Sequence, residues 1–196
     1  IAPRCGSRVI DHGEATAEAV VLLHGFTNCP AQFDLVAQAY ADAGVSVVVP
    51  RLPSHGNADR LAKDLSALTP GMLTTATDEA LDIAAGLGER VTVMGLSGGG
   101  TTAAWAAATR DDVDEAILVA PLVVPKILPR ILVDPVARFS RYTPDVYLWW
   151  DGDQQAALED PPYAYPRFSV RSLGAFLAVG HAVGQHLDRT TTMDRL

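Results

Sequence analysis

Four short, continuous apolar runs constrain the fold of this chain more than any other feature. They are Ala19–Leu23, Val45–Val49, Val91–Met94 and Ile117–Val119. Each run is rich in Val, Ile or Leu and is bounded by glycine, proline or charged residues. Runs of this kind are typical of strands buried on both faces, as in a parallel sheet.

Helical patterns separate these runs. Residues 31–43 place apolar side chains on one stripe before Gly44, and residues 70–86 do the same between Pro70 and Gly86. Residues 98–109 are nearly all small and also fit a helix. Alternation of strand and helix predicts an α/β fold with a mostly parallel sheet and flanking helices.

The amino-acid composition changes after Val119. Eight of the 13 prolines fall between Pro121 and Pro166, together with most of the aromatic residues, and residues 172–187 again fit a helix. We therefore predict a core in residues 1–121, a cap insertion in 122–187, and the start of a return to the core in 188–196. Four cap aromatics either line an apolar pocket or pack the cap on the sheet; they are Phe139, Tyr147, Trp149 and Trp150.

Composition narrows the class of protein. A chain of 196 residues with 48% hydrophobic residues fits one folded domain and not a disordered chain. A net charge of −8 disfavours nucleic acid as a partner, and no apolar stretch is long enough to span a bilayer. The two cysteines, Cys5 and Cys29, allow at most one disulfide.

A serine stands at a predicted strand-to-helix turn. Gly95-Leu96-Ser97-Gly98-Gly99 directly follows one apolar run and directly precedes the small-residue helix. This setting is typical of a nucleophile elbow, in which tiny neighbours let strand and helix approach closely. The helix start directs backbone N–H groups at the place where an oxyanion would form. Ser97 is therefore the candidate nucleophile.

Three segments carry a resemblance to a known family. His24-Gly25-Phe26 ends the first apolar run, Pro50-Arg51-Leu52-Pro53-Ser54-His55-Gly56 follows the second, and the Ser97 turn follows the third. In this order the chain resembles the α/β-hydrolase family, most closely its carboxylesterases and monoacylglycerol lipases. The resemblance implies a cap after the strand that follows the nucleophile helix. It also implies an oxyanion hole formed by the N–H groups of Phe26 and Gly98, and a small apolar ester as substrate.

A base and an acid are needed beside Ser97. In this fold they follow the nucleophile in the chain, and His181 and His186, the only later histidines, fall on the predicted cap helix. His24 and His55 are expected to bond their own loops, and Asp134 is interpreted as a turn residue. We therefore expect the triad Asp and His to lie beyond Leu196, in a longer hydrolase of which this chain is the N-terminal part.

Two alternatives remain open from the sequence. One is a non-catalytic binding protein on a hydrolase scaffold, and the other is cleavage of a thioester, amide or carbon–carbon bond. No metal-ligand spacing and no nucleotide-binding glycine motif occurs, so we expect neither metal nor cofactor. We expect a cytoplasmic protein, although the chain starts at Ile1 and a removed signal peptide would leave secretion equally open. The sequence predicts no oligomeric state.

Overall fold

A five-stranded sheet forms the centre of the computed structural model, which describes residues 1–122, 130–153 and 163–193 (the backbone alone for residues 130 and 188–193). The strand order is β1-β3-β2-β4-β5, with β1 antiparallel to β3 and every other pair parallel. The strands are β1 (Arg8–Ile10), β2 (Thr16–Leu23), β3 (Ser46–Val49), β4 (Gly88–Leu96) and β5 (Glu115–Val119).

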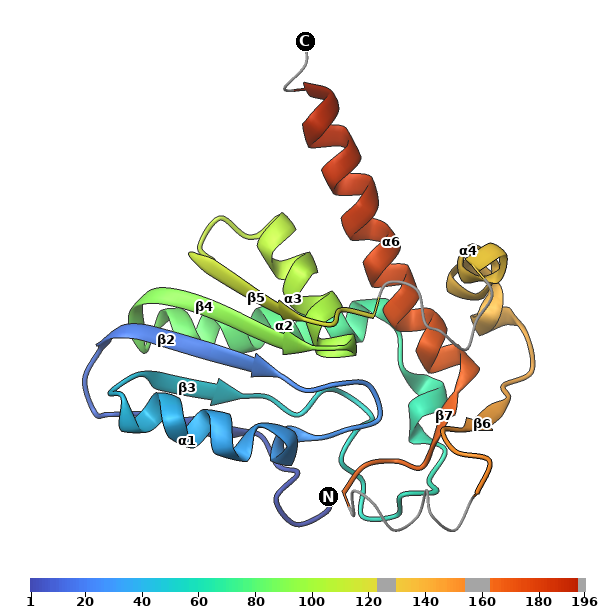
Figure 1. Ribbon diagram of the computed structural model, residues 1–196, viewed down its shortest axis with the longest axis horizontal. Helices are drawn as coiled ribbons and strands as arrows, with labels where there is room; N and C mark the ends of the chain where they lie inside the picture. Colours follow the sequence, from blue (N-terminus) through green and yellow to red (C-terminus); the bar gives the residue numbers. More distant parts are fainter. Residues whose placement is uncertain (123–129, 154–162, 194–196) are drawn as a thin grey trace.

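Helices cover both faces of this sheet (Figure 1). They are α1 (Asp34–Asp42), α2 (Pro70–Ala85) and α3 (Gly98–Thr109), with short 3-10 helices η1 (Pro30–Phe33) and η2 (Asp64–Ala67). Alternate residues of β2 enter different cores: Val20 and Leu22 pack with Phe33 and Ala37 near α1, whereas Val21 packs in the core of α2 and α3. Burial on both faces is why the strand sequences are continuously apolar and not alternating.

The four predicted strands and three predicted core helices are all present. The mostly parallel sheet with flanking helices that the sequence predicted is confirmed. Of the five strands of this sheet only β1 was missed, because three residues with no continuous apolar run give no strand pattern.

We call the region after β5 the cap, as predicted from the sequence. It contains α4 (Arg130–Phe139), η3 (Ser140–Tyr142), the antiparallel strands β6 (Tyr147–Trp149) and β7 (Arg167–Ser169), and α6 (Val170–Met193). Figure 1 shows α6 passing near the carboxyl ends of the strands, beside α4, and then projecting away from the sheet. Residues 123–129 and 154–162 of the predicted cap lie outside the described residues.

The helix predicted over residues 172–187 is present as α6, which extends to Met193. The return of residues 188–196 to the core stays a prediction. One expectation for the cap needs correction. Asp134 lies inside α4 and not in a turn. Pro135 misled the interpretation: it sits in the middle of α4, where its missing N–H removes one intrahelical hydrogen bond but does not end the helix. The division into core and cap at residue 121 stays a prediction.

No helix among the described residues is both long enough and apolar enough to cross a membrane.

Candidate active site

Ser97 occupies a sharp turn between β4 and α3. Its backbone angles are φ 54° and ψ −114°, a left-handed conformation that costs a non-glycine residue strain energy. Hydrogen bonds hold this geometry: the Ser97 N–H donates to the Val119 carbonyl at 2.9 Å. The Ser97 carbonyl accepts from the N–H groups of Thr101 at 3.1 Å and Leu122 at 3.0 Å. Within the described part of the chain the Ser97 hydroxyl has no hydrogen-bond partner, so it is available to a ligand.

The glycines two positions before and after Ser97 are required by close packing. A Cβ on Gly95 would lie 2.1 Å from the Gly99 carbonyl oxygen, and a Cβ on Gly99 would lie 1.9 Å from the Leu23 carbonyl oxygen. No side chain fits at such distances, so strand and helix approach this closely only when both positions are glycine.

The structure brings Phe26 beside Gly98. The Phe26 backbone nitrogen lies 3.0 Å from the position that a Cβ of Gly98 would occupy. The Phe26 N–H donates to no acceptor among the described residues, and the Gly98 N–H belongs to the unsatisfied first turn of α3. Two free N–H donors therefore meet at the elbow, which is the arrangement that an oxyanion hole requires.

The loop that carries Phe26 is braced by its own polar groups. The Gly25 N–H donates to Gln32 Oε1 at 2.7 Å, and the Leu52 N–H donates to His24 Nε2 at 3.0 Å. His24 Nδ1 lies 3.0 Å from the Gly25 carbonyl oxygen and is assigned as the protonated nitrogen. His24 is therefore a structural residue that ties the β2 loop to the β3 loop.

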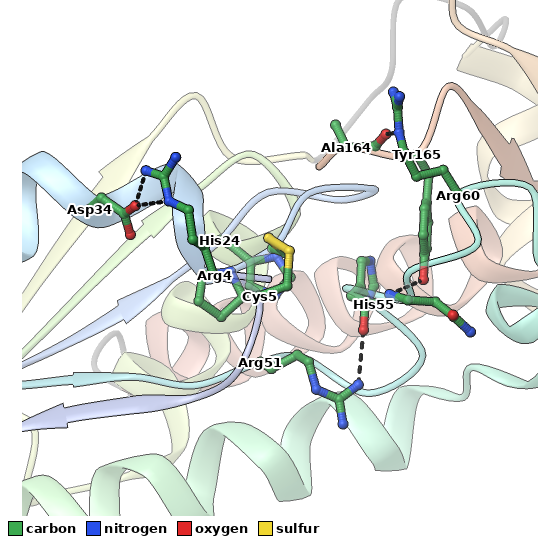
Figure 2. Close-up of a disulfide and its surroundings, with 12 residues drawn as sticks. Arg4, Cys5, His24, Asp34, Arg51, His55, Arg60, Ala164 and Tyr165 are labelled. Atoms are coloured by element: carbon green, nitrogen blue, oxygen red, sulfur yellow. Dashed lines mark hydrogen bonds and ion pairs between the residues drawn. A yellow bond between two sulfur atoms is a disulfide. The ribbon is translucent and has the colours of Figure 1, made fainter. Parts of the chain in front are cut away.

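A disulfide adds a covalent tie to the same loop (Figure 2). Cys5 and Cys29 are bonded, both fully buried, and Cys29 is three residues after Phe26. Arg4 and Arg8 pair with Asp34 at the start of α1, which holds the N-terminal segment in place beside the bond. The disulfide thus links this segment to the base of the loop.

The cap contacts this loop through Thr27, which has φ 63°. The Trp150 indole N–H donates to Thr27 Oγ1 at 2.9 Å, and the Tyr165 N–H donates to the Thr27 carbonyl at 2.7 Å. Aromatic rings of the cap also surround the Phe26 ring, with centroid distances of 5.1 Å to Phe176 and 5.8 Å to Phe168.

Of the four cap aromatics singled out in the sequence, only Trp150 contacts the Phe26 ring, at 6.0 Å. Tyr147 donates from its hydroxyl to the Lys63 carbonyl, and Phe139 is largely exposed.

His55 is buried in the same aromatic cluster. Its Nδ1 lies 2.8 Å from the Pro53 carbonyl oxygen, whereas Nε2 is buried with no hydrogen-bond partner among the described residues. Burial lowers the pKa of His55 to about 4. Burial and the nearby His55 lower the pKa of His24 to about 3. Both imidazoles are therefore neutral at pH 7, and both hold their own loops as expected.

His181 and His186 both lie on α6, within the cap. His181 Nδ1 lies 3.6 Å from Asp134 Oδ1 on α4, and His181 Nε2 lies 2.9 Å from the Gln185 side-chain nitrogen. His186 is exposed on the same helix. Among the described residues, no histidine bonds to Ser97, and no group of three or more His, Cys, Asp or Glu side chains is arranged to hold a metal ion.

Sequence reasoning missed Thr27, Trp150 and the disulfide as supports of the loop. Thr27 and Trp150 are 123 residues apart, and no local pattern signals a hydrogen bond across that distance. Only the presence of two cysteines hinted at the disulfide.

Comparisons with known proteins agree with this geometry. The family model described as "Alpha/beta hydrolase family" matches residues 20–193. A thermostable monoacylglycerol lipase from Bacillus sp. (strain H-257) is 33% identical over 94 residues, which cover 48% of this chain and 36% of that lipase. The match thus spans about a third of that relative's length.

Solved structures share the fold. One of the metagenome-derived lipolytic enzymes LipS and LipT superposes with a TM-score of 0.75 at 22% identity, covering 95% of this chain and 72% of that one. A monoacylglycerol lipase from Paleococcus ferrophilus gives a TM-score of 0.71 at 18% identity, covering 92% and 71%. With the family model matching most of its length, this chain belongs to the α/β hydrolase family.

Proposed function

We propose that this chain carries the nucleophile and the oxyanion hole of a serine hydrolase that cleaves carboxylic esters, of the carboxylesterase or monoacylglycerol lipase type. The observation that carries the proposal is the strained Ser97 turn with the free Phe26 N–H directly beside Gly98. The relatives named as lipolytic enzymes and monoacylglycerol lipases support the choice of an ester.

The chemistry follows from these parts. Ser97 Oγ attacks the ester carbonyl carbon and its proton passes to a general base. The Phe26 and Gly98 N–H groups hold the oxygen that becomes negative. Collapse of the tetrahedral intermediate breaks the bond to the alcohol, which leaves with a proton, and water then releases the acyl group from Ser97. Loss of one oxyanion donor costs about 3 kcal/mol of transition-state stabilisation in other hydrolases.

The substrate class is a small apolar ester. The rings of Trp150, Phe168 and Phe176 surround Phe26, so the cap adjoining the oxyanion loop is predominantly apolar. An apolar acyl or alcohol chain gains free energy when it leaves water for such a surface.

A second candidate is a binding protein that keeps the scaffold without turnover. It is favoured by one observation: no histidine among the described residues contacts Ser97. Cleavage of a thioester, amide or carbon–carbon bond would use the same nucleophile and oxyanion donors, so comparison of turnover across these substrates distinguishes them from esters.

Labelling with a fluorophosphonate probe tests the proposal on the natural full-length protein. We expect one adduct by intact mass, located on Ser97. The Ser97→Ala variant should lose the adduct and reduce kcat for an ester on the order of 10⁶-fold, as in other serine hydrolases. Ser7→Ala, at an exposed serine, is the matched control. Ligand binding without any adduct would favour the binding protein.

A further inference from the structure

A cavity of about 280 Å³ lies at the junction of cap and core, away from Ser97. Its walls come from η2 and the start of α2 on the core side, and from α4, η3 and α6 on the cap side. Ser97, Phe26 and Gly98 do not line it. Ligand sites commonly occupy such junctions, and this volume lies just below the ~300–1,000 Å³ of small-molecule pockets. We call it the arginine cavity.

Three arginines line the cavity: Arg138, Arg141 and Arg171. No carboxylate belongs to the lining, and among the described residues none of the three guanidinium groups forms an ion pair. Arg171 donates to the Thr143 carbonyl, and Arg141 lies 4.4 Å above the Tyr142 ring and donates to its hydroxyl. Arg138 donates to no protein group in the described part of the chain.

The two nearby acidic side chains, Asp134 and Asp145, bond to other groups and not to the three guanidinium groups. Asp145 accepts from the Ser169 hydroxyl at 2.6 Å and from the Arg171 backbone N–H at 3.2 Å. Asp134 faces His181 across α4 and α6. The protein as a whole carries a net charge of −8, so three arginines around one cavity, none with an ion-pair partner among the described residues, are a local reversal of its charge. An anion bound between them relieves their mutual repulsion and gains charge-assisted hydrogen bonds.

The remaining wall is mainly apolar, with Ser66, Thr69 and Ser140 as its polar members. Methyl groups of Ala67, Ala137, Ala175 and Ala178 contribute to the lining, together with Leu68. A ligand that satisfies both parts of the wall has a charged head and a short apolar tail. Inorganic phosphate would use the arginines alone and leave the alanine surface in contact with water.

We propose that the arginine cavity binds a small carboxylate with a short apolar tail, with its head at Arg138, Arg141 and Arg171. Hydrolysis of an apolar ester releases an anion of this class. Binding in the cavity nevertheless requires no reaction at Ser97, so the two proposals stand or fall separately.

Calorimetric titration of the full-length protein with octanoate tests this site. We expect saturable binding of octanoate, with 1-octanol and inorganic phosphate each at least tenfold weaker, because each lacks one half of the ligand. Arg138→Gln should weaken octanoate about tenfold, the effect of losing one charge-assisted contact. Arg90→Gln, at an exposed arginine of β4, is the matched control and should bind as the parent protein does.

Other outcomes would overturn the proposal. Equal affinity for octanoate and 1-octanol would show that the arginines do not contribute to binding. Equal affinity for octanoate and phosphate would show that the apolar wall does not contribute. Identical octanoate binding by the Arg138→Gln and Arg90→Gln variants would place the ligand elsewhere. Arg141→Gln provides a second variant if Arg138→Gln does not fold. Ser97→Ala should bind octanoate unchanged, which separates this site from the proposed catalytic one.

Discussion

Backbone geometry at single residues explains why the elbow tolerates so few amino acids. Ser97 adopts a positive φ that its own hydrogen bonds to Val119, Thr101 and Leu122 maintain. The strain is therefore stabilised by the surrounding sheet and helix and is present before any ligand arrives.

Gly99→Ala should severely destabilise the protein. Its Cβ would lie 1.9 Å from the Leu23 carbonyl oxygen, so β2 and α3 must separate, at a cost of about 3 kcal/mol or more. Gly71→Ala is the matched control, since its Cβ meets nothing within 4 Å in α2 and the change should raise stability by up to about 1 kcal/mol. Urea unfolding of both variants measures the difference; similar stabilities would contradict the packing argument.

Acid should destabilise the protein through its two buried histidines. Burial holds the pKa of His24 at about 3 and that of His55 at about 4, both below the ordinary 6.5. Below about pH 6.5 the unfolded chain therefore binds protons that the native protein does not bind. The free energy of unfolding is at its full value above that pH. It falls as the pH decreases toward 4, by up to about 1.4 kcal/mol per pH unit for each histidine.

His55→Asn should reduce the slope of unfolding free energy against pH between 6 and 4 relative to that of the parent protein. An unchanged slope in His55→Asn would show that this imidazole is protonated in the native state.

Between elements, the contact of the cap strands with the loop after β2 connects the two parts of the molecule. Trp150 from the end of β6 and Tyr165 from the segment before β7 both bond to Thr27, directly after Phe26. The cap therefore supports the backbone that presents one of the proposed oxyanion donors.

Thr27→Val should lower kcat for ester hydrolysis about tenfold with a smaller change in KM, because the Phe26 N–H acts on the transition state more than on the ground state. Trp150→Phe keeps the ring, removes the donor, and should reproduce this effect. Thr27→Ser should restore activity, and Thr75→Val, at an exposed threonine of α2, should leave it unchanged. If kcat/KM fell by the same factor through a higher KM with kcat unchanged, Thr27 would act on substrate binding instead.

At the scale of the whole molecule, the disulfide restricts the conformations that the unfolded chain can adopt. Cys5 and Cys29 are 24 residues apart, and closing a loop of that length stabilises a fold by about 3 kcal/mol in the chain-entropy model. Reduction, or the Cys5→Ser/Cys29→Ser double variant, should lower the thermal midpoint by several degrees. Thiol titration before and after unfolding reports the bond; two free thiols in the freshly isolated native protein would refute it. Disulfides persist mainly in oxidising compartments, so the same titration on protein from its native source also tests the expectation of a cytoplasmic protein.

The sequence by itself determined the parallel sheet, its helices and the position of the elbow. These follow from local patterns: continuous apolar runs of three to five residues, small residues at 98–109, and glycines on both sides of Ser97. The proximity of Phe26 and Gly98 was expected from the family resemblance, and the 3.0 Å approach of Phe26 nitrogen to the Cβ position of Gly98 agrees with it.

Only the tertiary structure decided the rest. The Thr27–Trp150 hydrogen bond, the pairing of Asp134 with His181 and the convergence of three arginines on one cavity each join residues far apart in the chain. Such contacts depend on how the cap packs on the core, and that packing leaves no periodic signal in the sequence. The proline-rich cap, where local patterns are weakest, is accordingly where the expectation for Asp134 was wrong.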